Sequence, residues 1–334
     1  MVRRWGVSKN EERHFSPLTC SRGSRRTLCI AAVPERPCVL ESGRSCPGQA
    51  AAEVLLSAPT VEPSELKLLG FRLHPMTAEE VIAQIGAAVT DRRRLVMANL
   101  NVHGMAMMYE SAGMARLLFQ PDCQVMIDGM PVLFLANLLN RAGLGREKRT
   151  TSLDFYDDLF ARGRANGWQF AYIGSRPEVL ESGIEILRER FPDLKIEGRD
   201  GYFDFRDFTP GSRNMDIVDW LRDLSPDVVI VGMGMPRQEE WIEYVQHQID
   251  ARVFLPTGAY LDYQVGVQAT PPRWLGRYGL EWAYRFMRSP YRLGFRYFIE
   301  PVILTWRILK HRPLANGQSL SKGTRGSEQT WLSL

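Results

Sequence analysis

The sequence predicts an α/β fold: a doubly wound, Rossmann-like and mostly parallel sheet, followed by a helical C-terminal appendage. Three observations predict the sheet. From Leu66 onward, short apolar runs alternate with longer amphipathic segments, as in repeated βαβ units. The run Val228 to Val231 is continuously apolar and mostly β-branched, which is typical of a strand buried on both faces of a parallel sheet. Polar residues follow several of these runs, at the strand ends where open α/β sheets bind ligands.

The composition is that of a globular protein. Of 334 residues, 45% are hydrophobic, and the formal net charge of +4 is too small to indicate a nucleic-acid partner. Four of the five cysteines lie within the first 50 residues at spacings that match no zinc site, so we expect a reducing compartment and no disulfide framework. No run of 18 uncharged apolar residues and no signal-peptide core occur. We therefore expect neither a membrane span nor secretion.

Composition divides the chain into four segments. Residues 1–62 are rich in Arg, Ser, Pro and Gly and keep no regular period, so we expect a disordered N-terminal extension. A transit peptide would share this composition, although its four glutamates argue against one, and an upstream start codon that extends the true protein is also open. The other segments are a Rossmann-like domain (63–269), a basic and aromatic helical appendage (270–312) and a disordered tail (313–334).

Short apolar runs followed by turn residues mark the strands. We predict strands at 69–73, 95–98, 124–127, 168–173, 194–197, 228–231 and 252–255.

Caps and prolines mark the helix starts. Thr77 and Glu80 form a capping box, and Pro177 and Pro236 suit a first helical position, where no N–H is needed. We predict helices from Thr77 to about 89, from about 104 to 118, at 132–139, from Asp154 to about 165, at 177–190, at 215–224 and from Pro236 to about 248.

The turn after Val231 is a candidate anion site. Gly232 and Gly234 lie between a buried strand and a helix N-terminus, which leaves backbone N–H groups for an anion such as a nucleotide diphosphate. Arg237 and Gln238 would lie beside it. A plain β-to-α turn with an Arg–Glu surface pair is the structural alternative. A dinucleotide fold is a weaker alternative, because the third glycine and the ribose-binding acid are absent.

Polar side chains at the predicted strand ends are further candidates. Asp128 follows a buried strand and is the best candidate for a general base, with capping of the next helix as the structural alternative. Asn99 and Asn101 would hold sugar hydroxyls or the loop backbone, and His103 would be a ligand, a second base or structural. Other polar groups at such positions are Arg149, Gln238 and Thr257.

Arginines, rather than a metal, are expected to neutralise a leaving diphosphate. The chain has no Asp-x-Asp pair, which argues against the Mn²⁺ or Mg²⁺ clamp of many sugar-nucleotide enzymes. Arg285, Arg288, Arg292 and Arg296 share one helix face if Pro290 only kinks the helix. Together with many aromatic residues, they predict a segment that lies on a membrane surface. A helix pair docked on the sheet is the alternative.

Taken together, the motifs resemble the WecG/TagA/CpsF family of glycosyltransferases from about residue 66 to 306. The resemblance rests on Asn101-Val-His103, Ile127-Asp-Gly-Met-Pro131, Arg149-Thr-x-x-x-Asp154, Gly174, Gly232-Met-Gly-Met-Pro-Arg-Gln-Glu239 with Trp241, Gly258-Ala259-x-x-Asp262, Pro271-Pro-Arg-Trp-Leu-Gly276 and Gly279-Leu-Glu-Trp282. It implies transfer of a sugar from a UDP-sugar to a polyprenyl-diphosphate-linked acceptor. The transfer would invert the sugar and need no metal or other cofactor, at the inner, cytoplasmic face of the cell membrane.

The resemblance also implies roles for single residues. Asp128 matches the family's proposed base, Asn101 its active-site asparagine, Gln238 its Pro-x-Gln-Glu glutamine and Arg149 a substrate-pocket arginine. Gly258 and Asp262 belong to a further family motif. The appendage arginines would close over the substrate and touch the membrane surface; they include Arg273, Arg277, Arg285, Arg288 and Arg292.

The form of the motifs is closest to the GumM-like exopolysaccharide branch of the family. Several family members have a threonine where this chain has Asn99, so the donor sugar stays open among a hexose, N-acetylmannosamine and a uronic acid. The family's tendency to oligomerise permits a homo-oligomer. Two alternatives are a non-catalytic nucleotide-sugar-binding scaffold of an envelope assembly complex and a nicotinamide-dependent dehydrogenase.

Overall fold

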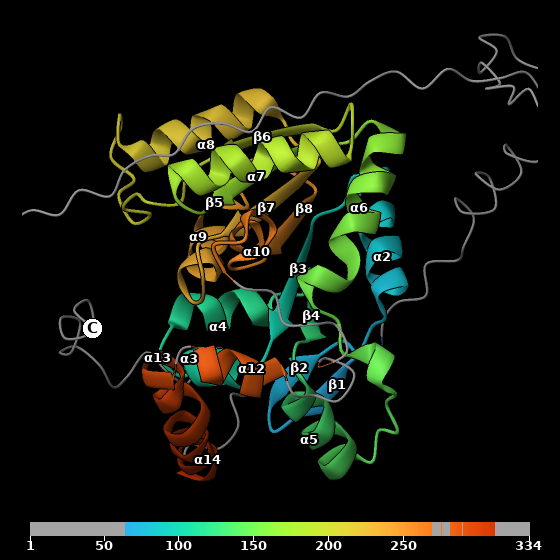
Figure 1. Ribbon diagram of the computed structural model, residues 1–334, viewed down its shortest axis with the longest axis vertical. Helices are drawn as coiled ribbons and strands as arrows, with labels where there is room; N and C mark the ends of the chain where they lie inside the picture. Colours follow the sequence, from blue (N-terminus) through green and yellow to red (C-terminus); the bar gives the residue numbers. More distant parts are fainter. Residues whose placement is uncertain (1–63, 269–274, 276–280, 289, 311–334) are drawn as a thin grey trace, which may run out of the picture. The chain divides into compact units, whose positions relative to one another are not determined.

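A parallel sheet forms the centre of the protein, as the sequence predicts. The computed structural model describes residues 64–268, 275, 281–288 and 290–310. Its six-stranded sheet has the order β4 (Cys123–Ile127), β3 (Leu95–Leu100), β8 (Val253–Pro256), β7 (Val228–Gly232), β5 (Gln169–Gly174) and β6 (Lys195–Arg199) (Figure 1). Every neighbouring pair is parallel, so all carboxyl ends lie along one edge. The predicted extension and tail lie outside the described residues.

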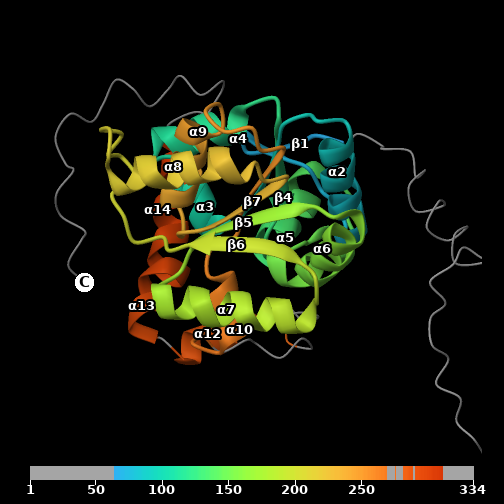
Figure 2. The same ribbon diagram turned by 90° about the horizontal axis from the view of Figure 1, so that it is seen from above.

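Helices cover both faces of this sheet (Figure 2). Successive strand residues alternate between two hydrophobic clusters: Val96 and Ala98 belong to one, and Leu95 and Met97 to the other. The first cluster includes residues of α3 (Val102–Met107), α4 (Ala112–Phe119), α5 (Met130–Asn140), α8 (Arg213–Leu224) and α9 (Arg237–Val245). The second includes residues of α2 (Ala78–Thr90), α6 (Ser152–Asn166), α7 (Pro177–Arg190) and α10 (Tyr260–Val265). This two-sided burial confirms the doubly wound prediction.

The C-terminal region is helical. It contains α12 (Glu281–Arg288), α13 (Pro290–Gly294), a π-helical turn η2 (Phe295–Ile299) and α14 (Glu300–Lys310), while a short 3₁₀ helix, η1 (Arg146–Lys148), precedes α6. Leu304 of α14 is buried in the first cluster. Among the described helices, none is both long enough and apolar enough to cross a membrane.

A capping box, a proline and an apolar run form the helix starts and the strand that the sequence predicts for them. Thr77 and Glu80 form both bonds of the capping box at the start of α2. The α7 helix begins at Pro177 and ends at Arg190, as predicted. The four residues Val228–Val231 are fully buried, as expected for a central parallel strand.

Other boundaries were predicted wrongly. The segment around 69–73 is an antiparallel hairpin, β1 (Leu66–Leu68) and β2 (Phe71–Leu73), because Leu69 and Gly70 both take positive φ angles and make a two-residue turn. The predicted helix 104–118 is two helices, since Ser111 caps α4 through its side chain. Pro236 precedes α9 rather than starting it, β3 extends through Asn99, and α10 and η1 were not predicted.

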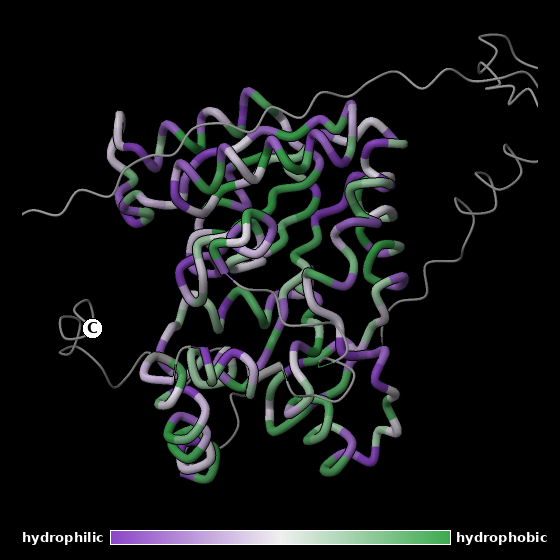
Figure 3. Tube along the Cα trace, in the orientation of Figure 1, coloured by the Kyte–Doolittle hydropathy of each residue, from purple (hydrophilic) through white to green (hydrophobic). Residues whose placement is uncertain are grey.

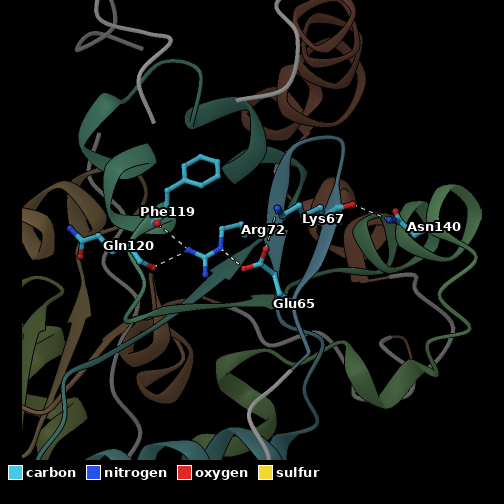
Figure 4. Close-up of polar contacts among 6 residues, drawn as sticks. All are labelled: Glu65, Lys67, Arg72, Phe119, Gln120 and Asn140. Carbon is cyan, nitrogen blue, oxygen red and sulfur yellow. Dashed lines mark hydrogen bonds and ion pairs between the residues drawn. The ribbon is translucent and has the colours of Figure 1, made fainter. Parts of the chain in front are cut away.

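Polar contacts fix the hairpin between α5 and the end of α4 (Figure 4). Arg72 donates from Nη1 to the carbonyl oxygens of Phe119 and Gln120, both at 3.0 Å, and from Nε to Glu65 at 2.8 Å. On the other side, Asn140 Nδ2 donates to the Lys67 carbonyl oxygen at 2.9 Å. The hairpin therefore supports α5 from outside the main sheet.

Gly232 ends β7 at a point where the backbone leaves no room for a side chain. A Cβ atom there would lie 2.7 Å from the Gly258 carbonyl oxygen and would also overlap the Tyr172 hydroxyl. The glycine therefore allows the turns after β7 and β8 to pack together, which differs from the anion-binding role predicted for it.

We expect Gly232→Ala to lower the free energy of unfolding by about 1–3 kcal/mol, the usual cost of overpacking a rigid site. Urea denaturation would measure it. Gly86→Ala in α2 is the matched control, because its nearest neighbour would be the flexible Arg162 guanidinium at 3.3 Å. That control should be neutral or stabilising by about 0.5–1 kcal/mol. Equal stability of Gly232→Ala and wild type would contradict the close-packing role.

Candidate functional site

The predicted strand-end residues lie around one large pocket. It has a volume of about 2640 Å³ and lies at the carboxyl ends of β4, β3, β8 and β7, which are neighbours in the sheet. Twelve of the predicted residues line it: Asn99, Asn101, His103, Asp128, Arg149, Gly234, Gln238, Thr257, Gly258, Asp262, Arg285 and Arg288. Gly232 and Arg237 do not line it. Arg273, Arg277 and the side chain of Arg292 lie outside the described residues.

Asp128 and Asn101 form a pair at the ends of β4 and β3. Asn101 Nδ2 donates to Asp128 Oδ2 at 2.9 Å, and Asn101 Oδ1 accepts the Gly104 N–H at 2.9 Å at the start of α3. One carboxamide therefore caps a helix and orients the carboxylate. No side chain caps α5, so the alternative role of Asp128 as a helix cap is wrong. Gly129, with φ of 98°, lets the chain turn from β4 directly into α5.

Arg149 lies next to Asp128 because its backbone extends the sheet edge. A single parallel bridge pairs it with Ile127, and the Thr150 N–H donates to the Ile127 carbonyl oxygen at 3.0 Å. The Arg149 side chain is mostly buried and lies 3.6 Å from Asp154. Arg149 and Asp128 both line the pocket, so this backbone pairing brings a cationic residue to the same cavity as the candidate base.

Gln238 connects the turns after β7 and β8. Its Oε1 accepts the N–H groups of Gly234 at 3.1 Å and Gly258 at 3.0 Å, and the side chain is almost fully buried. The expectation that the Gly234 N–H is free for an anion is therefore wrong. Both lone pairs of the Gln238 oxygen are used, so only its nitrogen side is left for a substrate.

Arg237 points away from the pocket. Its Nη2 donates to the carbonyl oxygens of Gly201 at 3.3 Å and Phe203 at 3.0 Å, and its guanidinium stacks over the Phe205 ring. The expectation that it would lie beside a bound anion is wrong, because consecutive residues at a helix start point in different directions. Arg237 instead holds the loop after β6.

Glu239 is a buried acid behind this turn. Gln238 Nε2 donates to Glu239 Oε1 at 2.8 Å, and Oε2 has no hydrogen-bond partner among the described residues. Burial raises the pKa of Glu239 to about 7, and the Gln238 bond opposes this shift. The carboxyl group therefore changes its charge in the neutral pH range while it contacts the residue that holds both glycine turns.

Arginines of the C-terminal helices also line the pocket. Arg285 stacks over Tyr263 and Arg288 over Tyr284, at 5.5 and 5.4 Å from the ring centres. Arg296, which the sequence places on the same helix face but which we did not select as a site residue, also lines the pocket. Burial lowers its pKa, while the nearby Glu300 and Asp128 carboxylates oppose that shift. Arg296 thus lies close enough to Asp128 for the two charges to interact.

A side-chain contact between His103 and Glu300 connects α14 to the strand-end region. His103 Nδ1 lies 2.8 and 2.9 Å from the two carboxylate oxygens of Glu300, which is buried. Arg307 of α14 pairs with Glu110 at 2.8 Å. His103 therefore holds α14 against the pocket, a role that its position in the sequence did not reveal because its partner lies 197 residues away.

In the described part of the chain, no three His, Cys, Asp or Glu residues gather in a way that could hold a metal ion. Metal independence stays a prediction. Asn99 reaches the pocket from within β3, and its Oδ1 has no hydrogen-bond partner among the described residues, so its proposed contact with a sugar also stays a prediction.

Comparison with known proteins identifies relatives. The family model described as "Glycosyl transferase WecG/TagA/CpsF family" matches residues 66–317. The chain is also similar to the N-acetylglucosaminyldiphosphoundecaprenol N-acetyl-beta-D-mannosaminyltransferases of Staphylococcus aureus strains MW2 and MRSA252. Each is 27% identical over 146 residues, which are 44% of this chain and 55% of the relative. The matched segment thus spans about half the length of these relatives.

We expect Glu239→Gln to remove part of the pH dependence of stability. A carboxyl group with a raised folded pKa favours the folded state fully below its unfolded value of 4.5, and this contribution is lost as pH rises to about 7. The difference in the free energy of unfolding between the variant and wild type should therefore shift in favour of the variant, by up to about 3 kcal/mol, between pH 4.5 and pH 8. Urea denaturation at the two pH values would measure this. Glu79→Gln, at an exposed position of α2, is the control; identical pH profiles for Glu239→Gln and wild type would rule the effect out.

Proposed function

Because the chain belongs to the WecG/TagA/CpsF family of glycosyltransferases, we propose that it transfers a sugar from a UDP-sugar to a polyprenyl-diphosphate-linked acceptor. The observation that carries this proposal is the Asn101–Asp128 pair, which lies in a pocket that Arg285, Arg288 and Arg296 also line. The pair supplies a base, and the arginines supply positive charge for a diphosphate.

Asp128 is the proposed general base. Its Oδ2 is oriented by Asn101, and Oδ1 takes no part in that bond. As the acceptor hydroxyl attacks C1 of the donor sugar, Asp128 takes the hydroxyl proton, and a new bond forms between the acceptor oxygen and C1. The bond from C1 to the UDP oxygen breaks, and its electron pair leaves with UDP. Attack from the side opposite UDP inverts the configuration at C1.

Arginines would stabilise the leaving diphosphate. Arg285 and Arg288 come from α12 and Arg296 from η2, so three guanidinium groups converge on the pocket from one C-terminal segment. Guanidinium groups suit this task because they stay charged and donate two parallel hydrogen bonds to a phosphate. This arrangement supports the proposal that leaving-group charge is neutralised without a metal ion.

The size of the pocket supports a reaction between two large substrates. Sites for single small molecules usually measure about 300–1,000 Å³. The volume of about 2640 Å³ leaves room for a nucleotide sugar beside a sugar diphosphate.

The names of the relatives favour particular substrates. The S. aureus relatives are named for N-acetylmannosaminyl transfer to N-acetylglucosaminyldiphosphoundecaprenol, and we propose the same acceptor class and N-acetylmannosamine as the first donor to test. A hexose and a uronic acid remain the other donors. The exopolysaccharide branch suggested by the motifs has no support from these relatives. Such an acceptor would place the protein at the inner face of the cell membrane as a peripheral protein.

We expect Asp128→Asn to lower kcat by about 10²-fold or more while UDP binding stays near wild type, because general bases usually contribute that much. Single-turnover transfer and UDP titration would measure the two effects. Asp157→Asn is the matched control, since Asp157 lines the same pocket but pairs with Arg190 at 3.1 Å. A variant as fast as wild type would exclude Asp128 as the base.

We expect UDP release only when one particular UDP-sugar and a polyprenyl-diphosphate acceptor are both present, and we expect it to persist in excess EDTA. A panel of UDP-sugars with a membrane lipid extract would test this. Loss of activity in EDTA that Mg²⁺ or Mn²⁺ restores would contradict metal independence. UDP binding without transfer to any acceptor would favour the non-catalytic scaffold.

A further inference from the structure

Helix α5 carries an apolar face that no other described residue covers. Of its eleven residues, only Asn137 and Asn140 are polar. Phe134, Leu138 and Leu139 are 63%, 60% and 53% exposed. Figure 3 shows this helix as one of the hydrophobic segments at its end of the described region. Contiguous exposed apolar side chains of this size mark an interaction surface.

The rest of the helix holds this face outward. The Asn140 side chain donates to the Lys67 carbonyl oxygen of β1, and the Asn137 side chain exchanges two hydrogen bonds with the backbone of Leu144. Val132 and Leu133 are buried on the inner side. Both polar side chains of α5 are thus used to fix its orientation, so the exposed face is a stable feature of the fold.

The exposed face of α5 is continuous with the candidate active site. Phe134 and Leu135 line the pocket that contains Asp128, and Leu304 and Ile308 of α14 line it from the other side. Figure 1 shows α5 and α14 at the same end of the described region. The α14 helix also exposes large apolar residues one helical turn apart, Val302, Trp306 and Leu309, of which Leu309 lines the pocket. The pocket therefore opens between two helices that both present apolar surface.

Basic residues accompany both helices. The loop after α5, residues 141–149, contains four Arg or Lys residues and one acid, although Lys148 pairs with Glu80 and Arg149 with Asp154. At the end of α14, the Lys310 ammonium lies 4.5 Å from the centre of the Trp306 ring. Apolar side chains combined with neighbouring cations are typical of surfaces that bind anionic bilayers. A two-fold contact between copies would bring the basic loops together, which like charges disfavour.

We infer that α5 is a second membrane-binding helix, which inserts Leu138 and Leu139 into the surface of an anionic bilayer on the side of the pocket opposite α14. The membrane contact expected from the sequence involved only the C-terminal appendage. With α5 added, the pocket mouth would lie against the bilayer between two anchors. The reason for such a contact, the delivery of a lipid-linked acceptor, rests on the proposed function. The contact with lipid can be measured without any transfer reaction.

The test is co-sedimentation of the full chain with vesicles of phosphatidylethanolamine and phosphatidylglycerol. Leu138→Ser combined with Leu139→Ser should weaken partitioning by about tenfold or more, since two apolar side chains lose their lipid environment. Neither residue lines the pocket, so UDP binding should stay at the wild-type level and show that the variant is folded.

Two matched variants separate apolar character from general surface change. Leu138→Met with Leu139→Met keeps the apolar surface and should bind vesicles like wild type. Tyr202→Ser with Tyr244→Ser removes exposed aromatic rings elsewhere, at residues that do not line the pocket, and should also leave binding unchanged.

Unchanged vesicle binding of the serine variant would overturn the inference. So would conversion of an oligomer to a monomer with unchanged vesicle binding, because α5 would then be a contact between copies. The proposed function fails separately: if wild type binds vesicles through α5 but transfers no sugar to any acceptor, the membrane surface stands and the glycosyltransferase proposal does not.

Discussion

The parallel pairing of β4, β3, β8 and β7 is the constraint on which the candidate site depends. Parallel strands place their carboxyl ends at one edge, so the residues that follow four neighbouring strands converge although Asn101 and Gly258 are more than 150 positions apart in sequence. The hydrophobic clusters on both faces keep the strands in register. Side chains at the strand ends then complete the site: Asn101 orients Asp128, and Gln238 joins the turns after β7 and β8.

Both apolar packing and polar pairs place the C-terminal helices at the pocket, since Leu304 of α14 is buried in the first hydrophobic cluster. The buried Glu300 carboxylate is satisfied by His103, and Arg307 pairs with Glu110, so α14 has a defined position against α3. This placement brings Arg285, Arg288 and Arg296 to the pocket that contains Asp128. The π-helical turn that contains Arg296 falls between α13 and α14, and such turns occur often at functional sites.

Two helices that line the pocket, α5 and α14, both expose apolar side chains to the outside. A soluble protein normally buries side chains such as Phe134 and Trp306, and the hydrogen bonds of Asn137 and Asn140 show that α5 is held in place with its apolar face outward. A lipid-linked acceptor gives this arrangement a physical reason, because its reactive end must reach Asp128 while its chain stays in the bilayer.

The sequence by itself determined the fold class, the succession of most strands and helices along the chain, and twelve of the residues that line the candidate pocket. These depend on local signals: apolar runs of strand length, caps such as Thr77 and prolines such as Pro177, and polar residues at strand ends. Only the tertiary structure decided the direction and partners of single side chains. Arg237 and Gln238 are adjacent in sequence, yet one holds a distant loop and the other joins two turns. The His103–Glu300 pair and the outward face of α5 were likewise undecidable from sequence, because ion pairs and burial depend on segments that meet only after the chain has folded.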